Sequence, residues 1–315
     1  MTATATTTRT RVLPTPEDYA ALSPRPGSPV WKAFNDARML GTAGYAIMLQ
    51  VAHPTVGAGV HQYSSFTKDP WGRLFRTLDY VHGTVYGGPE LAGQIGARVR
   101  NMHKTIKGPL TDGSGERYSA MEPGAFAWVH ATLAVGIVYG NEDFGRPMSA
   151  GDKQAFWAQW RDVGRLIGVR YRDLPEEWTD FQTYFDGVVR DELVWTPAVP
   201  EVLDLVNAPT IPPIPGLPRG AWKALNKPLS AGVNIVMAGM LPVDLRERLG
   251  IRYNRADQAA YRAFCAASKA STPLIRGPLS SYGEFWVRAR AKQLARGDVA
   301  GSAQHPAGEP GAAAA

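Results

Sequence analysis

The stretch "SAGDKQAFWAQWRDVGRLIG", residues 149–168, decides the fold class. Its large apolar residues recur at spacings of three and four, which is the spacing of one face of an α-helix. These residues are Phe156, Trp160, Val163 and Ile167. Ser149 precedes Asp152 by three positions, and this pair predicts a capping box at the start of the helix. The stretch therefore predicts an amphipathic helix with one buried face.

The same periodicity continues in both directions along the chain. "EEWTDFQTYFDGVVRDELV" (176–194) has an apolar stripe of Trp178, Phe181, Phe185 and Val188. "FAWVHATLAVGIVY" (126–139) is apolar nearly all round, as is typical of a helix buried inside a domain. Asn254 predicts a further helix start. Because the chain shows neither a strand–helix alternation nor an internal repeat, we predict an all-α fold, a single domain of about ten helices.

Both ends and one internal stretch depart from this pattern. Residues 1–30 are rich in Thr and Pro, and we expect a flexible N-terminal segment there. Residues 296–315 lack apolar side chains that could offset the entropy of ordering, and we expect a disordered tail. The proline-rich run 196–220 predicts an irregular crossover with one short turn of helix. The folded domain is accordingly expected at 31–295.

Composition excludes several classes of protein. The single cysteine, Cys265, excludes disulfide frameworks and multi-cysteine metal sites. The net charge is +6, but the basic residues are spread along the chain without a nucleic-acid-binding motif, so we expect no nucleic-acid partner. No signal-peptide-like stretch opens the sequence, which predicts a cytoplasmic protein. The apolar run at 231–241 is too short for a transmembrane helix, and peripheral membrane contact stays open.

No standard hydrolase, nucleotide or di-iron motif is present, which directs attention to the histidines between residues 53 and 130. They are His53, His61, His82, His103 and His130. His103 flanks an apolar stripe that includes Val99 and Met102, with Arg100 and Lys104 on the adjacent arc. Such a histidine is either a hydrogen-bonded core residue or a haem-iron ligand with cations placed for the propionates.

Three further features have two readings each. His130 lies on the all-apolar stretch and is either structural or a pocket residue. In "HPTVGAGVH" (53–61), Gly57 would let the backbone approach either a neighbouring helix or a flat cofactor. In "WGRLFRTLDYV" (71–81), Arg73, Arg76 and Thr77 share one helix face, opposite Leu74, Phe75, Leu78 and Val81. That polar face is directed either to water or to a bound group.

Three segments in order resemble a known family: "GYAIMLQVAHPTVGAGVHQYSSFTKDPWGRLFRTLDYVHGTVYGG" (44–88), "RVRNMHKTIKG" (98–108) and "YSAMEPGAFAWVHATL" (118–133). They resemble the DUF2236 family, which includes rubber oxygenase and MpaB-type oxygenases, over about residues 32 to 290. The resemblance implies a globin-like arrangement of helices around a non-covalent b-type haem. It also implies oxygenases that cleave carbon–carbon double bonds of isoprenoids with dioxygen.

The resemblance also assigns roles to individual residues. His103 matches the proximal iron ligand, and Arg73 and Thr77 match an R-x-x-K-T motif beside the haem. Arg76 replaces the lysine of that motif, and an arginine is a poor iron ligand. The acidic residue proposed as a base in the rubber-cleaving branch has no clear counterpart, since only Asp36, Asp69 and Asp79 occur between residues 31 and 89. His61 is a candidate for that base.

We therefore expect a haem b-dependent oxygenase that acts with dioxygen, and where needed an electron donor, on a small hydrophobic substrate such as an isoprenoid or other unsaturated compound. The expected catalytic residues are Arg73, Arg76, Thr77 and His61, and the expected cofactor-binding residues are His103, Arg73, Arg76, Gly57 and His130. Two alternatives stay open. One is a haem-binding or haem-sensing protein without turnover, and the other is a cofactor-free helical interaction module.

Overall fold

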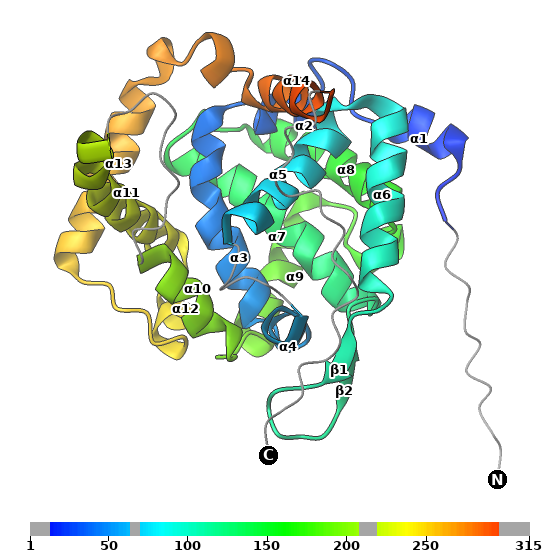
Figure 1. The fold of residues 1–315 in the computed structure, drawn as a ribbon, viewed down its shortest axis with the longest axis horizontal. Helices are drawn as coiled ribbons and strands as arrows, with labels where there is room; N and C mark the ends of the chain where they lie inside the picture. Colours follow the sequence, from blue (N-terminus) through cyan, green and yellow to red (C-terminus); the bar gives the residue numbers. More distant parts are fainter. Residues whose placement is uncertain (1–12, 64–69, 208–218, 296–315) are drawn as a thin grey trace.

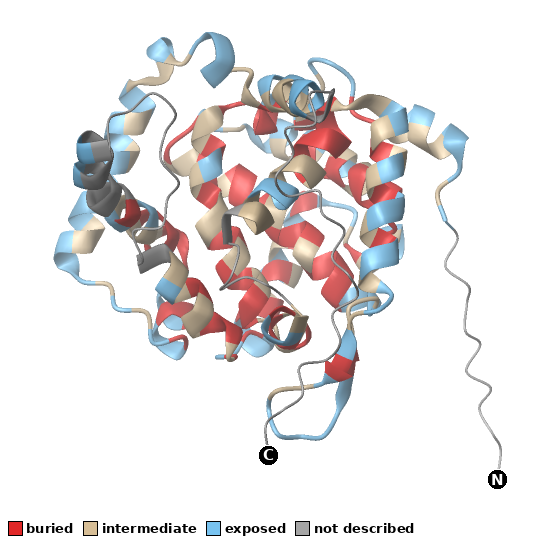
Figure 2. Ribbon diagram, in the orientation of Figure 1, coloured by how far each residue is buried: buried red, intermediate tan, exposed pale blue. Residues whose placement is uncertain are grey.

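Helix α7 (Pro123–Asp143) runs through the middle of the computed structural model, which describes residues 13–63, 70–207 and 219–295 (Figure 1). Helices α3 and α8 pack against it, and buried residues concentrate along these three helices (Figure 2). Among the described residues, α7 is the one helix long and apolar enough to cross a membrane, and 72% of its apolar stretch is buried inside the fold. The prediction of a buried core helix is confirmed.

The described residues form an all-α domain with one small sheet, which confirms the predicted fold class. The α-helices are α1 (Pro16–Leu22), α2 (Pro29–Phe34), α3 (Ala43–Ala52), α4 (Pro54–Tyr63), α5 (Pro70–Tyr86), α6 (Gly88–His103), α7, α8 (Ala150–Ile167), α9 (Trp178–Asp191), α10 (Ala198–Asn207), α11 (Arg219–Met240), α12 (Val243–Arg248), α13 (Arg255–Ala270) and α14 (Tyr282–Ala295). Short 3-10 helices are η1 (Ala37–Thr42), η2 (Tyr171–Asp173), η3 (Thr272–Leu274) and η4 (Gly277–Leu279). Strands β1 (Lys107–Pro109) and β2 (Arg117–Ser119) pair antiparallel between α6 and α7.

The aromatic stripes of α8 and α9 build one side of the core. Every predicted stripe residue of the two helices is at most 5% exposed. Trp157 of α8 stacks on Phe181 of α9 with ring centroids 3.8 Å apart. The capping box is present as predicted, because the Asp152 amide donates to Ser149 Oγ at 3.1 Å and the Ser149 amide donates back to the Asp152 carboxylate. Asn254 forms the corresponding box with Asp257.

The structure differs from the sequence-based expectations in several places. The run 196–220 contains a ten-residue helix, α10, instead of a single turn, and residues 208–218 lie outside the described residues. The β1–β2 hairpin was not predicted. Within the segment 1–30, residues 16–22 form α1, which packs on α6 and α8. The expectation of a disordered tail stays a prediction, because residues 296–315 lie outside the described residues. On α5, Phe75 is 39% exposed although its spacing predicts burial.

Helix α5 is held between α6 and α14. Gly88 adopts a φ of 76°, a left-handed conformation that favours glycine and lets the chain turn directly from α5 into α6. On its other side α5 is covered by α14, at the upper edge of Figure 1. Asp79 of α5 accepts hydrogen bonds from Trp286 Nε1 at 2.9 Å and from Arg290 Nε at 2.8 Å. Phe75 contacts Trp286 in the same interface.

Candidate functional site

His103 ends α6, and its ring is held in one tautomer by its own helix. Nδ1 lies 2.7 Å from the carbonyl oxygen of Val99. Because a carbonyl can only accept, Nδ1 carries the proton and Nε2 of the neutral imidazole carries the lone pair. The half-buried ring meets the ring of Phe126 edge to face at 5.5 Å. In a ring held through Nδ1, Nε2 is the nitrogen that could bind a metal.

The donor set of the described residues fits haem better than a bare ion. No three histidine, cysteine or carboxylate side chains in this part of the chain come together as a metal site. Porphyrin supplies four nitrogen ligands itself, so a single protein imidazole is sufficient to hold its iron. His103 offers one such imidazole nitrogen, Nε2, beside the apolar ring of Phe126.

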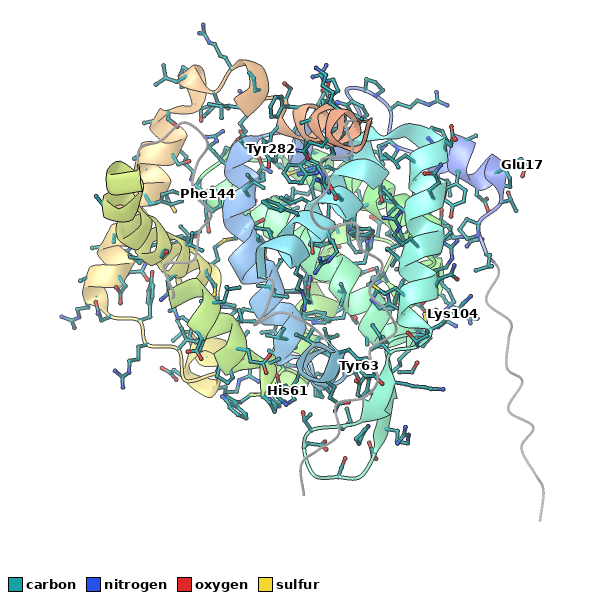
Figure 3. All side chains as sticks on the ribbon, viewed as in Figure 1. Glu17, His61, Tyr63, Lys104, Phe144 and Tyr282 are labelled. Atoms are coloured by element: carbon teal, nitrogen blue, oxygen red, sulfur yellow. The ribbon has the colours of Figure 1, made fainter. Side chains whose placement is uncertain are left out.

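The basic residues around His103 divide into two kinds. Arg100 is buried and donates to the Leu166 carbonyl at 3.0 Å, where it satisfies the last turn of α8. Arg100 therefore serves packing between α6 and α8. Lys104, the next residue in sequence after His103, is exposed (Figure 3). Met102, which the spacing places on the apolar stripe, is 55% exposed, so the inward edge of this turn consists of Val99 and His103.

The polar face of α5 is directed partly inward. Arg73 is half-buried, whereas Arg76 and Thr77 are exposed. Thr77 Oγ1 donates to the Arg73 carbonyl within the same helix at 3.1 Å. Burial and the neighbouring Arg76 lower the pKa of Arg73 to about 10, and Glu201 of α10 acts in the opposite direction. Arg73 stays protonated at neutral pH and lies close enough to Glu201 for their charges to interact.

His61, at the C-terminal end of α4, binds the same carboxylate. Its Nδ1 lies 2.6 Å from Glu201 Oε1, and its side chain is 41% exposed (Figure 3). The fold thus gathers residues from α4, α5 and α10, because Glu201 interacts with both His61 and Arg73. Sequence reasoning missed Glu201, since the proline-rich run 196–220 was expected to form a crossover. No pattern within that run marks Glu201 as a site residue.

Gly57 lies one turn before His61 and faces protein. A Cβ atom at Gly57 would stand 2.4 Å from the Val51 carbonyl oxygen and 2.5 Å from Thr196 Oγ1. The sequence left open whether Gly57 faces a neighbouring segment or a cofactor. In the structure it faces a neighbouring segment. Thr196 is buried and donates to the same Val51 carbonyl at 2.7 Å. Gly57 therefore allows α4 to approach the segment that leads into α10.

His130 lies in the core between α7 and α8. Its Nε2 is 2.7 Å from the Trp160 carbonyl oxygen, and burial lowers its pKa to about 4, so the imidazole is neutral at pH 7.

The aspartates between residues 31 and 89 that the structure describes are engaged in structural contacts. Asp36 pairs with Arg38 at 2.6 Å, and Asp79 binds α14 as described above. Asp69 lies outside the described residues.

A surface pocket of about 340 Å³ opens at a different place, near the C-terminal end of α3. His53, Trp128 and Tyr184 contribute to its lining, and none of the predicted site residues does. Burial lowers the pKa of His53 to about 4. The pocket is therefore separate from the group formed by His61, Arg73 and Glu201.

Comparison with protein-family models matches residues 31–270 to the catalytic domain of the ER-bound oxygenase mpaB/B' and rubber oxygenase. No curated protein and no solved structure matches the chain. The matched range begins just inside α2 and ends with α13. It includes His61, Arg73, His103 and Glu201, and it leaves α14 outside.

Proposed function

Because the chain belongs to the family of the ER-bound oxygenase mpaB/B' and rubber oxygenase catalytic domain, we propose that it is a haem b-dependent oxygenase. Its substrate is a small hydrophobic molecule, such as an isoprenoid or another unsaturated compound, and its oxidant is dioxygen. The observation that carries the haem assignment is the Nδ1 hydrogen bond of His103 to Val99, which directs the Nε2 lone pair away from its own helix.

The side chains of the chain divide the work as follows. His103 would hold the iron through Nε2. Arg73 and Arg76 lie close together, and the charge of Arg76 contributes to the lowered pKa of Arg73. Two neighbouring guanidinium groups favour an anionic partner such as a propionate. When bound, haem b supplies the redox chemistry with dioxygen that amino-acid side chains lack. His61 accepts or holds a proton at Nε2, since its Nδ1 is bonded to Glu201.

An absorption spectrum with a pyridine haemochrome assay tests the haem assignment. We expect the wild-type protein to bind haem b and to show a Soret band that His103→Ala loses or strongly shifts. Gln94→Ala, at an exposed position on the same helix, is the matched control and should keep the wild-type spectrum. Wild-type protein that takes up no haem on titration would overturn the proposal and favour a cofactor-free interaction module.

Oxygen consumption separates an oxygenase from a haem-binding protein without turnover. The haem-loaded protein is given an electron donor and either an unsaturated isoprenoid or its saturated analogue. We expect substrate-dependent oxygen uptake with the unsaturated compound and incorporation of labelled oxygen into the product. A normal haem spectrum without uptake across a panel of unsaturated substrates would favour the sensing alternative.

A further inference from the structure

We propose that Glu201 is a positioning residue of this site, which holds the proton of His61 on Nδ1 and thereby leaves Nε2 as the proton acceptor. The catalytic meaning of this inference rests on the proposed function, but the tautomer itself does not. The carboxylate comes from α10, 140 positions along the chain from His61.

The hydrogen bond between the two side chains fixes the tautomer. His61 Nδ1 and Glu201 Oε1 are 2.6 Å apart, and an ionised carboxylate only accepts hydrogen bonds. The proton of the neutral imidazole therefore belongs on Nδ1. The Nε2 atom lies on the other side of the ring, so it points away from Glu201. A histidine oriented in this way by a carboxylate is a standard form of general base.

Packing holds the carboxylate in place. Val199 and Val202, on either side of Glu201 in sequence, are fully buried and anchor α10 against its neighbours. The Glu201 side chain is 23% exposed, less than its partner imidazole at 41%. On the facing helix, Gly57 permits the close approach to Thr196 at the entrance to α10. One turn later the same face of α4 presents His61 to Glu201.

Glu201 also acts on Arg73. Its negative charge raises the pKa of that guanidinium against the opposing effects of burial and of Arg76. One carboxylate thus stands between an imidazole and a half-buried cation. Loss of Glu201 would disturb the proton position on one neighbour and the charge balance on the other.

Nitrogen-15 NMR of the histidine rings in the haem-free protein tests the tautomer directly. We expect His61 of the wild type, assigned by its absence in His61→Gln, to carry its proton on Nδ1. Glu201→Ala should move the neutral ring toward the Nε2-protonated form, whereas Glu201→Gln, which keeps an acceptor oxygen, should retain Nδ1–H. Asp204→Asn, at an exposed position on the same helix, is the control and should change nothing. An Nε2-protonated wild-type ring, or an unchanged ring in Glu201→Ala, would overturn the inference.

Kinetics of the haem-loaded protein then test the role in turnover. We expect Glu201→Ala to lower kcat for oxygen uptake by about 10²-fold, in the range for loss of an oriented base, with the Soret band unchanged. Glu201→Gln should recover part of kcat, because it keeps the orientation and loses the charge. If the wild type binds no haem, the proposed function fails and the tautomer result still stands. If the wild type turns over and Glu201→Ala keeps its kcat, the role of Glu201 fails and the proposed function stands.

Discussion

The imidazole of His130 lies flat on the indole of Trp160, with ring planes 1° apart and centroids 4.4 Å apart. Each side chain also donates to the backbone of the other: His130 Nε2 to the Trp160 carbonyl at 2.7 Å, and Trp160 Nε1 to the His130 carbonyl at 3.0 Å. A Cβ atom at Gly164 would stand 2.7 Å from His130 Nε2, so the pair fits only against a glycine. This reciprocal contact joins α7 to α8, and burial keeps the imidazole in it neutral at pH 7.

Stability should fall on acidification because three histidines with lowered pKa values resist protonation. Burial lowers the pKa of His53, His82 and His130 from 6.5 to about 4. Between these two values the unfolded chain binds protons that the folded chain does not. The contribution of these histidines to the free energy of unfolding should therefore be complete above about pH 6.5. It should decrease toward pH 4, by up to about 3 kcal/mol per histidine. Urea unfolding at about pH 7 and about pH 5 measures this change, and equal values would contradict it.

His82→Phe should stabilise the protein. His82 is 4% exposed, and neither ring nitrogen has a hydrogen-bond partner among the described residues. Tyr86 and Tyr282 lie 5.8 and 5.4 Å away, measured between ring centroids, so a phenyl ring suits the surroundings. Removing two unpartnered polar atoms should raise the free energy of unfolding by about 1 kcal/mol near pH 7 and flatten its pH dependence.

The control for this change is His130→Phe. Because His130 donates to Trp160, its replacement should leave a buried carbonyl unsatisfied and should destabilise the protein. Denaturant unfolding of both variants measures whether the free energy of unfolding rises in His82→Phe and falls in His130→Phe. A destabilised His82→Phe protein would show that the ring nitrogens of His82 contribute to the folded state.

Two glycine-to-alanine changes in helices should have opposite effects. At Gly57 the added methyl group would overlap the Val51 carbonyl and Thr196, and we expect a loss of about 2 kcal/mol. At Gly187 of α9 nothing lies within 4 Å of the added atom, so the greater helix propensity of alanine should stabilise by about 0.5 to 1 kcal/mol. Thermal unfolding of the two variants is the measurement, and a tolerated Gly57→Ala would show that α4 can move away from Thr196.

Asp79→Asn should loosen α14. The carboxylate binds Arg290 through two nitrogens and accepts from Trp286, and an amide would lose the charge and part of this pairing. We expect a loss of about 1 to 2 kcal/mol and faster proteolysis at the C-terminal end of the domain. Asp162→Asn, at a carboxylate of α8 that binds Tyr171 elsewhere on the surface, is the comparison and should leave this cleavage rate unchanged.

The sequence predicts those parts of the fold whose signal is local. The stripe of α8 and the caps at Ser149 and Asn254 follow from residues within one or two helical turns. Helix α10 was not predicted because the prolines of the run 196–220 suggested a break. Pro200 instead occupies the first turn, where the backbone N–H that proline lacks would have no helical partner.

The candidate site depends on contacts that no local pattern contains. Spacing leaves the Arg73 face open between water and a bound group, and the structure brings Glu201 close enough to act on Arg73. Spacing predicts Phe75 buried, but it is 39% exposed and contacts Trp286 of α14. Glu201 itself meets His61 only after the chain has folded. The surroundings of the side chains on α5 thus depend on α10 and α14, which are far away in sequence.

Helix α14 sets the C-terminal limit for a stable truncated form of this protein. The family match ends at residue 270, yet Tyr282 donates its backbone N–H to the Asn35 carbonyl at 2.8 Å, and Glu284 accepts from Trp31 and Asn35. A recombinant fragment that stops at the family boundary would therefore present α2 and the outer side of α5 to water and invite aggregation. Expression for crystallisation or assay should extend through residue 295, so that the domain used in the laboratory is the one that folds.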